Sequence, residues 1–126
     1  PFALEGPDDL AAAHAALQST GTAGLAARQF QTLSGGEQQR VAIASALAQL
    51  DRRGSAGEPG GRLLLLDEPT ASLDLRYQVE IAALIARLHD EARGSKSPLS
   101  IVTSTHDLRF AASVCQTVIL MSEGRI

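Results

Sequence analysis

The chain has 126 residues, of which 44% are hydrophobic and 20% are charged, and its formal net charge is -3. This length fits one domain or part of one, the hydrophobic share excludes a disordered chain, and the slight negative charge argues against binding to nucleic acids or anionic lipids. The single cysteine, Cys115, excludes an internal disulfide and fits a reducing compartment. Since the sequence has neither a signal peptide nor an apolar run of roughly 18 residues, we expect a cytosolic protein.

The first half of the chain predicts two helices. An alanine-rich stretch behind an acidic start predicts a short helix that breaks at Gly21. Ser34, followed three residues later by Glu37, is a capping box, and the apolar residues behind it recur at helical spacing. A firm second helix is therefore expected from Ser34 to about Leu50, and the residues 51–61, rich in glycine and proline, predict a loop.

The second half predicts strands that alternate with helices. Leu63 to Leu66 form an apolar run that ends abruptly at Asp67 and Glu68, which predicts a buried strand. A helix is expected from about Leu75 to Ala92, and the stretches "LSIVTST", which ends at His106, and "TVILM" predict two more strands around a short helix. This alternation predicts a parallel α/β sheet, in which active groups gather beyond the carboxyl ends of the strands.

The start of the second predicted helix has the features of an anion site. A helix start leaves backbone N–H groups unpaired and carries about half a positive charge, and glycines let a phosphate come close to the backbone. The stretch "LSGG" before a capped helix has this design. The alternative is an ordinary capped helix, in which Ser34 and Glu37 only satisfy each other.

Asp67 and Glu68 are adjacent carboxylates at a strand end, where neighbouring side chains face different ways. In phosphate-hydrolysing enzymes such a carboxylate holds Mg²⁺, and the next one orients or deprotonates the attacking water. The alternative is a pair that only caps the following turn. His106 can contact a terminal phosphate or steady a water, or it can form a structural hydrogen bond. Of the aromatic residues, Phe30 and Phe110 are expected in the core, and Tyr77 is expected to make a contact on a helix surface.

Four motifs, taken in this order, resemble those of the nucleotide-binding subunits of ABC transporters. They are "LSGGEQQR" at 33–40, "LLLLDEP" at 63–69, "SLD" at 72–74 and "STHD" at 104–107. The resemblance covers the chain from about Leu25 to the end and implies a role for each site residue. Ser34, Gly35, Gly36 and Glu37 correspond to the signature motif, Asp67 to the Walker B aspartate that binds the metal, Glu68 to the catalytic base, Ser72 and Asp74 to the D-loop, and His106 to the switch histidine.

In this family two subunits sandwich two ATP molecules head to tail, so the signature motif of one subunit caps the γ-phosphate of ATP held by the other. Glu37 stands where many members have glutamine. The resemblance therefore implies a second nucleotide-binding subunit as partner, in a homodimer, together with ATP and Mg²⁺.

The resemblance also implies the fold, an α/β fold of the P-loop NTPase kind with a parallel sheet. Residues of about 1–50 would belong to the ABC helical subdomain and residues of about 62–126 to the catalytic core. The phosphate loop, G-x-x-x-x-G-K-[ST], is absent from the sequence, and Lys96 lies away from any such glycine pattern. We therefore expect the carboxy-terminal portion of one nucleotide-binding domain, inactive alone and with bare apolar surface where further strands and helices would pack.

In detail the sequence is most similar to ATPases of importers for iron chelates, haem or cobalamin. That likeness implies an ATP-hydrolysing subunit bound to transmembrane permease subunits, peripheral at the cytoplasmic face of the inner membrane, without nucleic acid and without insertion into the membrane. An ABC ATPase of another transport class is the first alternative. The second alternative is a DNA-repair or chromosome ATPase, which would have coiled-coil heptads, zinc-binding cysteines or a basic face, and none of these is recognised in the sequence. A non-catalytic interaction fragment is the third.

Overall fold

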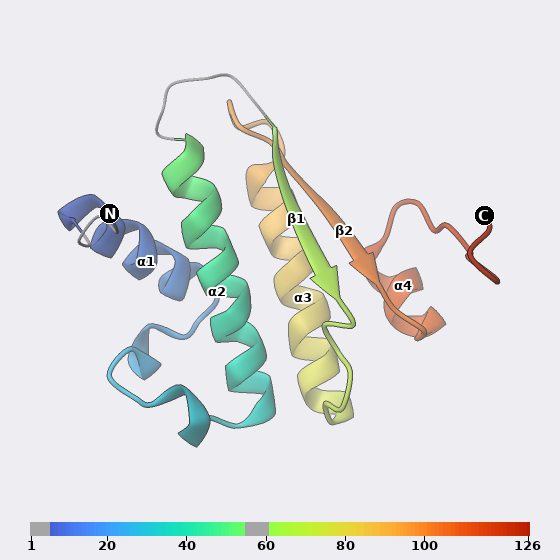
Figure 1. Cartoon of the computed structure of the whole chain (residues 1–126), viewed down its shortest axis with the longest axis horizontal. Helices are drawn as coiled ribbons and strands as arrows, with labels where there is room; N and C mark the ends of the chain where they lie inside the picture. Colours follow the sequence, from blue (N-terminus) through green and yellow to red (C-terminus); the bar gives the residue numbers. More distant parts are fainter. Residues whose placement is uncertain (1–5, 55–60) are drawn as a thin grey trace.

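The computed structural model describes residues 6–54 and 61–126 (Figure 1). Helices alternate with strands in the second half, as the sequence predicts, and the fold is α/β. The elements are α1 (Pro7–Ser19), the 3-10 turns η1 (Ala23–Leu25) and η2 (Phe30–Thr32), α2 (Gly35–Gly54), β1 (Arg62–Asp67), α3 (Leu75–Ala92), β2 (Leu99–Ser104) and α4 (Leu108–Val114).

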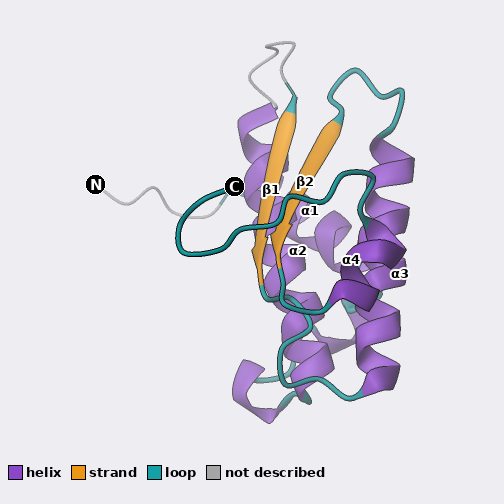
Figure 2. Ribbon diagram, turned by 90° about the vertical axis from the view of Figure 1, so that its right-hand side faces the viewer, coloured by secondary structure: helices purple, strands orange, loops and turns teal. Residues whose placement is uncertain are grey.

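The sheet consists of two parallel strands, β1 and β2, in a register that runs from Arg62 opposite Leu99 to Asp67 opposite Ser104. The connection between them is α3, which packs against β2, while α2 packs against β1. Figures 1 and 2 place these helices on one face of the sheet. Because the strands are parallel, both carboxyl ends lie at the same edge of the sheet.

The core lies between this face of the sheet and the helices. Leu64 and Leu99 point inward and are 3% and 5% exposed. They pack with apolar side chains that recur along α2 and α3 at helical spacing, which explains why these helices bury one side. The main helical contributors are Ile43, Ala44 and Leu47 of α2 and Ile81, Leu84, Ile85 and Leu88 of α3.

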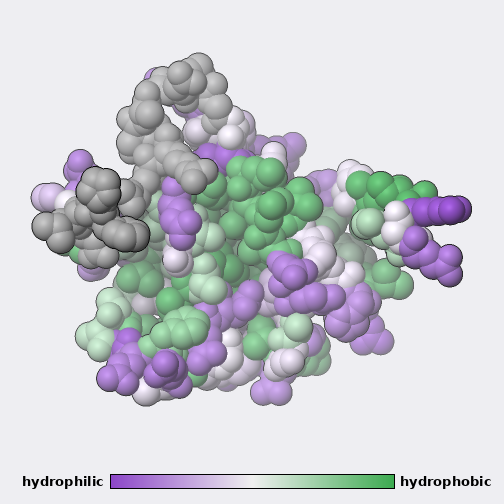
Figure 3. Space-filling view, viewed as in Figure 1, coloured by the Kyte–Doolittle hydropathy of each residue, from purple (hydrophilic) through white to green (hydrophobic). Residues whose placement is uncertain are grey.

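The opposite face of the sheet is bare. Leu63, Leu65 and Val102 are 52%, 67% and 57% exposed. Figure 3 shows hydrophobic side chains gathered over the two strands on this side. The expected exposed apolar surface is therefore present. A strand with apolar residues on both faces is normally covered on both, and here only one face packs against helices.

Three expectations need correction. The third strand, "TVILM", does not form, since Thr117–Met121 has no neighbouring strand among the described residues and an unpaired strand is not stable in water. Phe30 is 51% exposed, because it lies on the short turn η2 outside the core, whereas Phe110 is 5% exposed as expected. Helix α2 continues to Gly54, beyond the expected end at Leu50. The rest of the predicted loop, up to residue 60, lies outside the described residues.

Candidate functional site

Ser34 and Glu37 form the capping box that the sequence predicts. The backbone N–H and the hydroxyl of Ser34 donate to Glu37 Oε2 at 2.8 and 3.0 Å, and the Glu37 N–H donates to Ser34 Oγ at 3.4 Å. The hydrogen bond from the Ser34 N–H is the main reason that the pKa of Glu37 lies below its ordinary value. Ser34 and Gly35 are exposed at the helix start, while Gly36 is buried.

Gly36 is buried because the ring of Tyr77 lies against it. A β-carbon added at Gly36 would be 2.4 Å from Tyr77 Cδ1, which no real contact allows. Tyr77 is half-buried, and its packing on α2 agrees with the helix-surface contact that the sequence predicts.

Asp67 and Glu68 lie at the carboxyl end of β1, and β2 holds both of them through Ser104. The Ser104 hydroxyl donates to Asp67 Oδ1, and the Glu68 N–H donates to the Ser104 carbonyl at 3.1 Å. Here the chain leaves the strand with a φ of 44° at Glu68, in the left-handed region that is strained for residues other than glycine. The two carboxylates therefore project from a turn that the register of the sheet fixes.

Glu68 and His106 face each other across the ends of the two strands. His106 Nδ1 lies 2.9 and 3.0 Å from the two carboxylate oxygens of Glu68. The hydrogen bond and the negative charge of Glu68 raise the pKa of His106, and the charge of Asp107 adds to this. The His106 side chain is 83% exposed, so its other ring nitrogen is open to solvent.

Asp107 fixes the segment that carries His106. Its carboxylate accepts hydrogen bonds from the N–H groups of Arg109 and Phe110 at 2.8 and 3.2 Å and so caps α4. Because Phe110 is buried, this cap ties the histidine segment to the core.

Ser72 and Asp74 lie in the turn between Glu68 and α3, and both are exposed. Ser72 has a φ of 60°, and Asp74 is the N-cap residue of α3 without a side-chain cap hydrogen bond. Gln78 Nε2 donates to the Leu73 carbonyl at 2.9 Å and holds the turn from the helix side.

The predicted residues form two groups at one end of the molecule. Figure 1 shows the ends of both strands and the first turns of α2 and α3 at the same end. Asp67, Glu68 and His106 come together, linked through hydrogen bonds and the Ser104 hydroxyl. The capping box of Ser34 and Glu37 is a separate group, joined to α3 through Gly36.

Sequence reasoning missed three contributors. Ser104 was only part of a motif, although the parallel register of the two predicted strand ends would have placed it beside Asp67. Tyr77 and Glu80 were missed because their contacts cross from α3 to α2, and no local pattern in the sequence encodes them. Glu80 bonds Arg40 at 2.5 Å and Arg76 at 3.1 Å.

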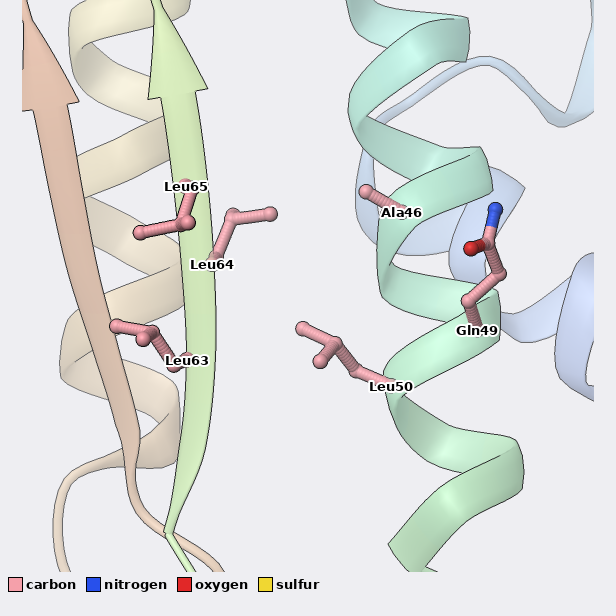
Figure 4. A pocket seen from close by; sticks show the side chains of 6 residues that line it. All are labelled: Ala46, Gln49, Leu50, Leu63, Leu64 and Leu65. Atoms are coloured by element: carbon pink, nitrogen blue, oxygen red, sulfur yellow. The ribbon is translucent and has the colours of Figure 1, made fainter.

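The structure also has a hollow of about 250 Å³ between α2 and β1. In Figure 4, Leu64 and Leu50 point toward each other across it, while Leu63 and Leu65 point away from α2. The lining includes no charged side chain, so the hollow offers no positive charge to a phosphate. Its lining residues are Ala46, Gln49, Leu50, Leu63, Leu64 and Leu65.

Within the described residues, no helix is both long and apolar enough to cross a membrane. The family model described as SbcC/RAD50-like, Walker B motif, matches residues 10–87. The chain is also 44% identical to the hemin import ATP-binding protein HmuV of Myxococcus xanthus over 97% of its own length and 42% of the relative's length. It is 38% identical to the cobalamin import ATP-binding protein BtuD of Halobacterium salinarum, over 94% of this chain and 26% of the relative.

A solved structure of a metal-chelate type ABC transporter in an inward-facing conformation superposes with a TM-score of 0.68 and 32% identity. The match covers 90% of this chain and 40% of that one. The chain therefore spans at most about two fifths of the length of these matches. Since the family model covers more than half of the chain, the chain belongs to the SbcC/RAD50-like Walker B family, and its relatives include hemin import and cobalamin import ATP-binding proteins.

Proposed function

We propose that the chain is part of the ATP-hydrolysing subunit of an ABC importer, with haem, cobalamin or an iron chelate as cargo. The observation that carries this proposal is the Glu68–His106 pair, held beside Asp67 at the carboxyl ends of two parallel strands. The names of the relatives support the cargo class. In this proposal Asp67, Glu68 and His106 act on ATP and its metal ion, so the cargo would be recognised by other parts of the importer.

Asp67 is the proposed metal residue. Mg²⁺ in phosphate-transferring sites is held by one or two carboxylates, by water and by the phosphates of the substrate. The described residues contain no group of three or more histidine, cysteine, aspartate or glutamate side chains that could hold a metal by themselves. One exposed carboxylate next to the Ser104 hydroxyl fits a metal ion that arrives with ATP, and when bound the ion would neutralise charge on the phosphates.

Glu68 is the proposed general base and His106 its orienting partner. A carboxylate within hydrogen-bonding distance of a water can accept the proton of that water as it attacks the terminal phosphate. The Nδ1 of His106 restrains both oxygens of the Glu68 carboxylate. The exposed Nε2 side of the same ring can then reach a terminal phosphate.

The capping box of Ser34 and Glu37 is proposed to act on ATP held by a second subunit. Ser34 and Gly35 at the start of α2, and Ser72 and Asp74 in the turn before α3, are exposed on the same end of the molecule. In the described part of the chain, no hydrogen bond connects the capping box of Ser34 and Glu37 with Glu68. This separation is compatible with two groups that act on different nucleotides. We therefore propose a homodimer that binds permease subunits at the cytoplasmic face of the membrane.

The description of the family model favours a second candidate, an ATPase of the chromosome and DNA-repair class. The net charge of -3 does not favour binding to DNA, and the relatives described above are import proteins. The importer is therefore the function we adopt. Stimulation of ATP hydrolysis by DNA would support the second candidate.

The test uses a hybrid protein, in which this chain replaces the matching two fifths of the Myxococcus xanthus relative. The hybrid should hydrolyse ATP in a Mg²⁺-dependent manner, whereas the 126 residues alone, without a phosphate loop, should neither bind ATP tightly nor hydrolyse it. In the hybrid, Glu68→Gln should lower kcat by about 10²–10⁴-fold, the usual contribution of a general base. Hydrolysis by the chain alone, or an unchanged kcat in Glu68→Gln, would overturn the proposal.

A further inference from the structure

The first turns of α2 and α3 are in unusually close contact. A β-carbon on Gly36 would lie 2.4, 2.7 and 3.0 Å from three ring atoms of Tyr77. A β-carbon on Gly35 would meet only the flexible end of Leu73, at 3.3 Å. Of the two adjacent glycines, Gly36 is therefore the one that the packing of this chain requires to be glycine.

An ionic bridge lies one helical turn further along both helices. Glu80 of α3 accepts a hydrogen bond from Arg40 of α2 at 2.5 Å and one from Arg76 at 3.1 Å. Hydrogen bonds from Arg76, and then from Arg40, hold the pKa of Glu80 below its ordinary value, so Glu80 is charged at neutral pH. The Nε of Arg40 is buried without a hydrogen-bond partner in the described part of the chain, and its Nη1 is the atom that donates to Glu80.

The same contact reaches the turn before α3. Leu73 lies between Ser72 and Asp74, and its side chain is the nearest neighbour of the Gly35 position. Its carbonyl accepts the Gln78 Nε2 hydrogen bond at 2.9 Å. The start of α2 and the turn before α3 are thus packed as one unit.

We propose that Tyr77 is a positioning residue, whose ring on Gly36, together with the Arg40–Glu80–Arg76 bridge, sets where the start of α2 lies relative to the turn at 72–74. This inference rests on the proposed function, in which both segments face a nucleotide held by a second subunit. Tyr77 itself need not touch the nucleotide. It acts through Gly36, and the aromatic ring rather than the hydroxyl is the part that does so.

The first experiment measures the contact in the purified chain, without any nucleotide. Alanine has a higher helix propensity than glycine, so Gly36→Ala would raise the melting temperature if helix propensity alone decided its effect. In this chain the methyl group meets the ring of Tyr77, and we expect Gly36→Ala to lower the melting temperature by roughly 5 °C or more. In a Tyr77→Ala background the same substitution should raise it or leave it unchanged.

Gly35→Ala is the matched control, since its nearest neighbour is Leu73 and not Tyr77. Its effect should be the same in the wild-type and Tyr77→Ala backgrounds. If Gly36→Ala also has the same effect in both backgrounds, the proposed contact is wrong.

The second experiment measures kcat and KM for ATP in the hybrid protein, per folded molecule. Tyr77→Phe keeps the ring and should retain kcat, whereas Tyr77→Ala should lower kcat by about 10-fold with little change in KM, because a misplacement of about 1 Å can cost up to 10²-fold in rate. An unchanged kcat in Tyr77→Ala, with Glu68-dependent hydrolysis intact, would overturn the positioning role alone. Loss of Glu68 dependence would overturn the proposed function, while the melting experiment would still decide the contact.

Discussion

The run of leucines in β1 provides a matched pair of perturbations, because neighbouring side chains of a strand point to opposite faces. Leu64 is 3% exposed and packs against the helices, whereas Leu65 is 67% exposed on the bare face. Leu64→Ala should lower the free energy of unfolding by about 2–5 kcal/mol, the range for buried leucines. Leu65→Ala should change it by about 0.5 kcal/mol or less, as at other exposed positions.

Urea denaturation of the purified chain, followed by circular dichroism, measures both changes. Light scattering at the same protein concentration is the control, since the exposure of Leu65 refers to a single chain. Equal losses for Leu64→Ala and Leu65→Ala in a monomeric chain would refute the assignment of the two faces.

If the chain associates, the bare face is its natural contact, and Leu65→Lys should shift the scattering mass toward the 13.2 kDa of one chain. A monomer of the unsubstituted chain at high concentration would count against this association.

Three further predictions concern the site. Because His106 has a raised pKa, its ion pair with Glu68 stabilises the chain fully at pH values below the ordinary 6.5, and this stabilisation is lost as the pH rises through the raised value. Glu68→Gln should move the pKa of His106, measured by NMR titration, back toward 6.5. An unmoved titration would show that the pair does not form. Because the pKa of Glu37 is lowered, its charge stabilises the chain at pH values above the ordinary 4.5, and this stabilisation is lost as the pH falls through the lowered value. Glu37→Gln keeps an acceptor oxygen but has no charge, so it should make the melting temperature less sensitive to acid in this range. Equal sensitivity in both proteins would contradict the capping role of the charge. Glu68→Gly should give a chain about 1 kcal/mol more stable in urea than Glu68→Gln, because glycine relieves the left-handed φ of 44°, and the reverse order would show that the turn stores no strain.

The sequence predicts best those features that depend on neighbouring residues. The capping box of Ser34 and Glu37 predicts the start of α2, and Asp67 marks the end of β1, as observed. The bounds of α3 also agree with the expected Leu75–Ala92. Each of these signals is local, since a cap, a charged strand end or a helical repeat is complete within a few residues.

Features that need a distant partner could not be predicted in this way. The stretch "TVILM" has the composition of a strand, but a strand forms only where another one lies beside it. Four successive leucines do not reveal which of them face the helices until the register is known. The contacts of Gly36 with Tyr77 and of Arg40 with Glu80 join residues about 40 positions apart, and nothing in either segment alone indicates them.

The segment from Glu68 to Tyr77 connects the two groups of the candidate site. It starts at the carboxylate that bonds His106, passes through the exposed Ser72 turn and ends with the ring that packs on Gly36. Its first residue is fixed to β2 by the Glu68 N–H, and its last lies in the first part of a helix whose inner face is buried in the core. A displacement at either end must therefore be absorbed within this short stretch or passed to the other end. The turn at 72–74 is therefore held at one end by the bond of Glu68 to β2 and at the other by the packing of Tyr77 on the start of α2.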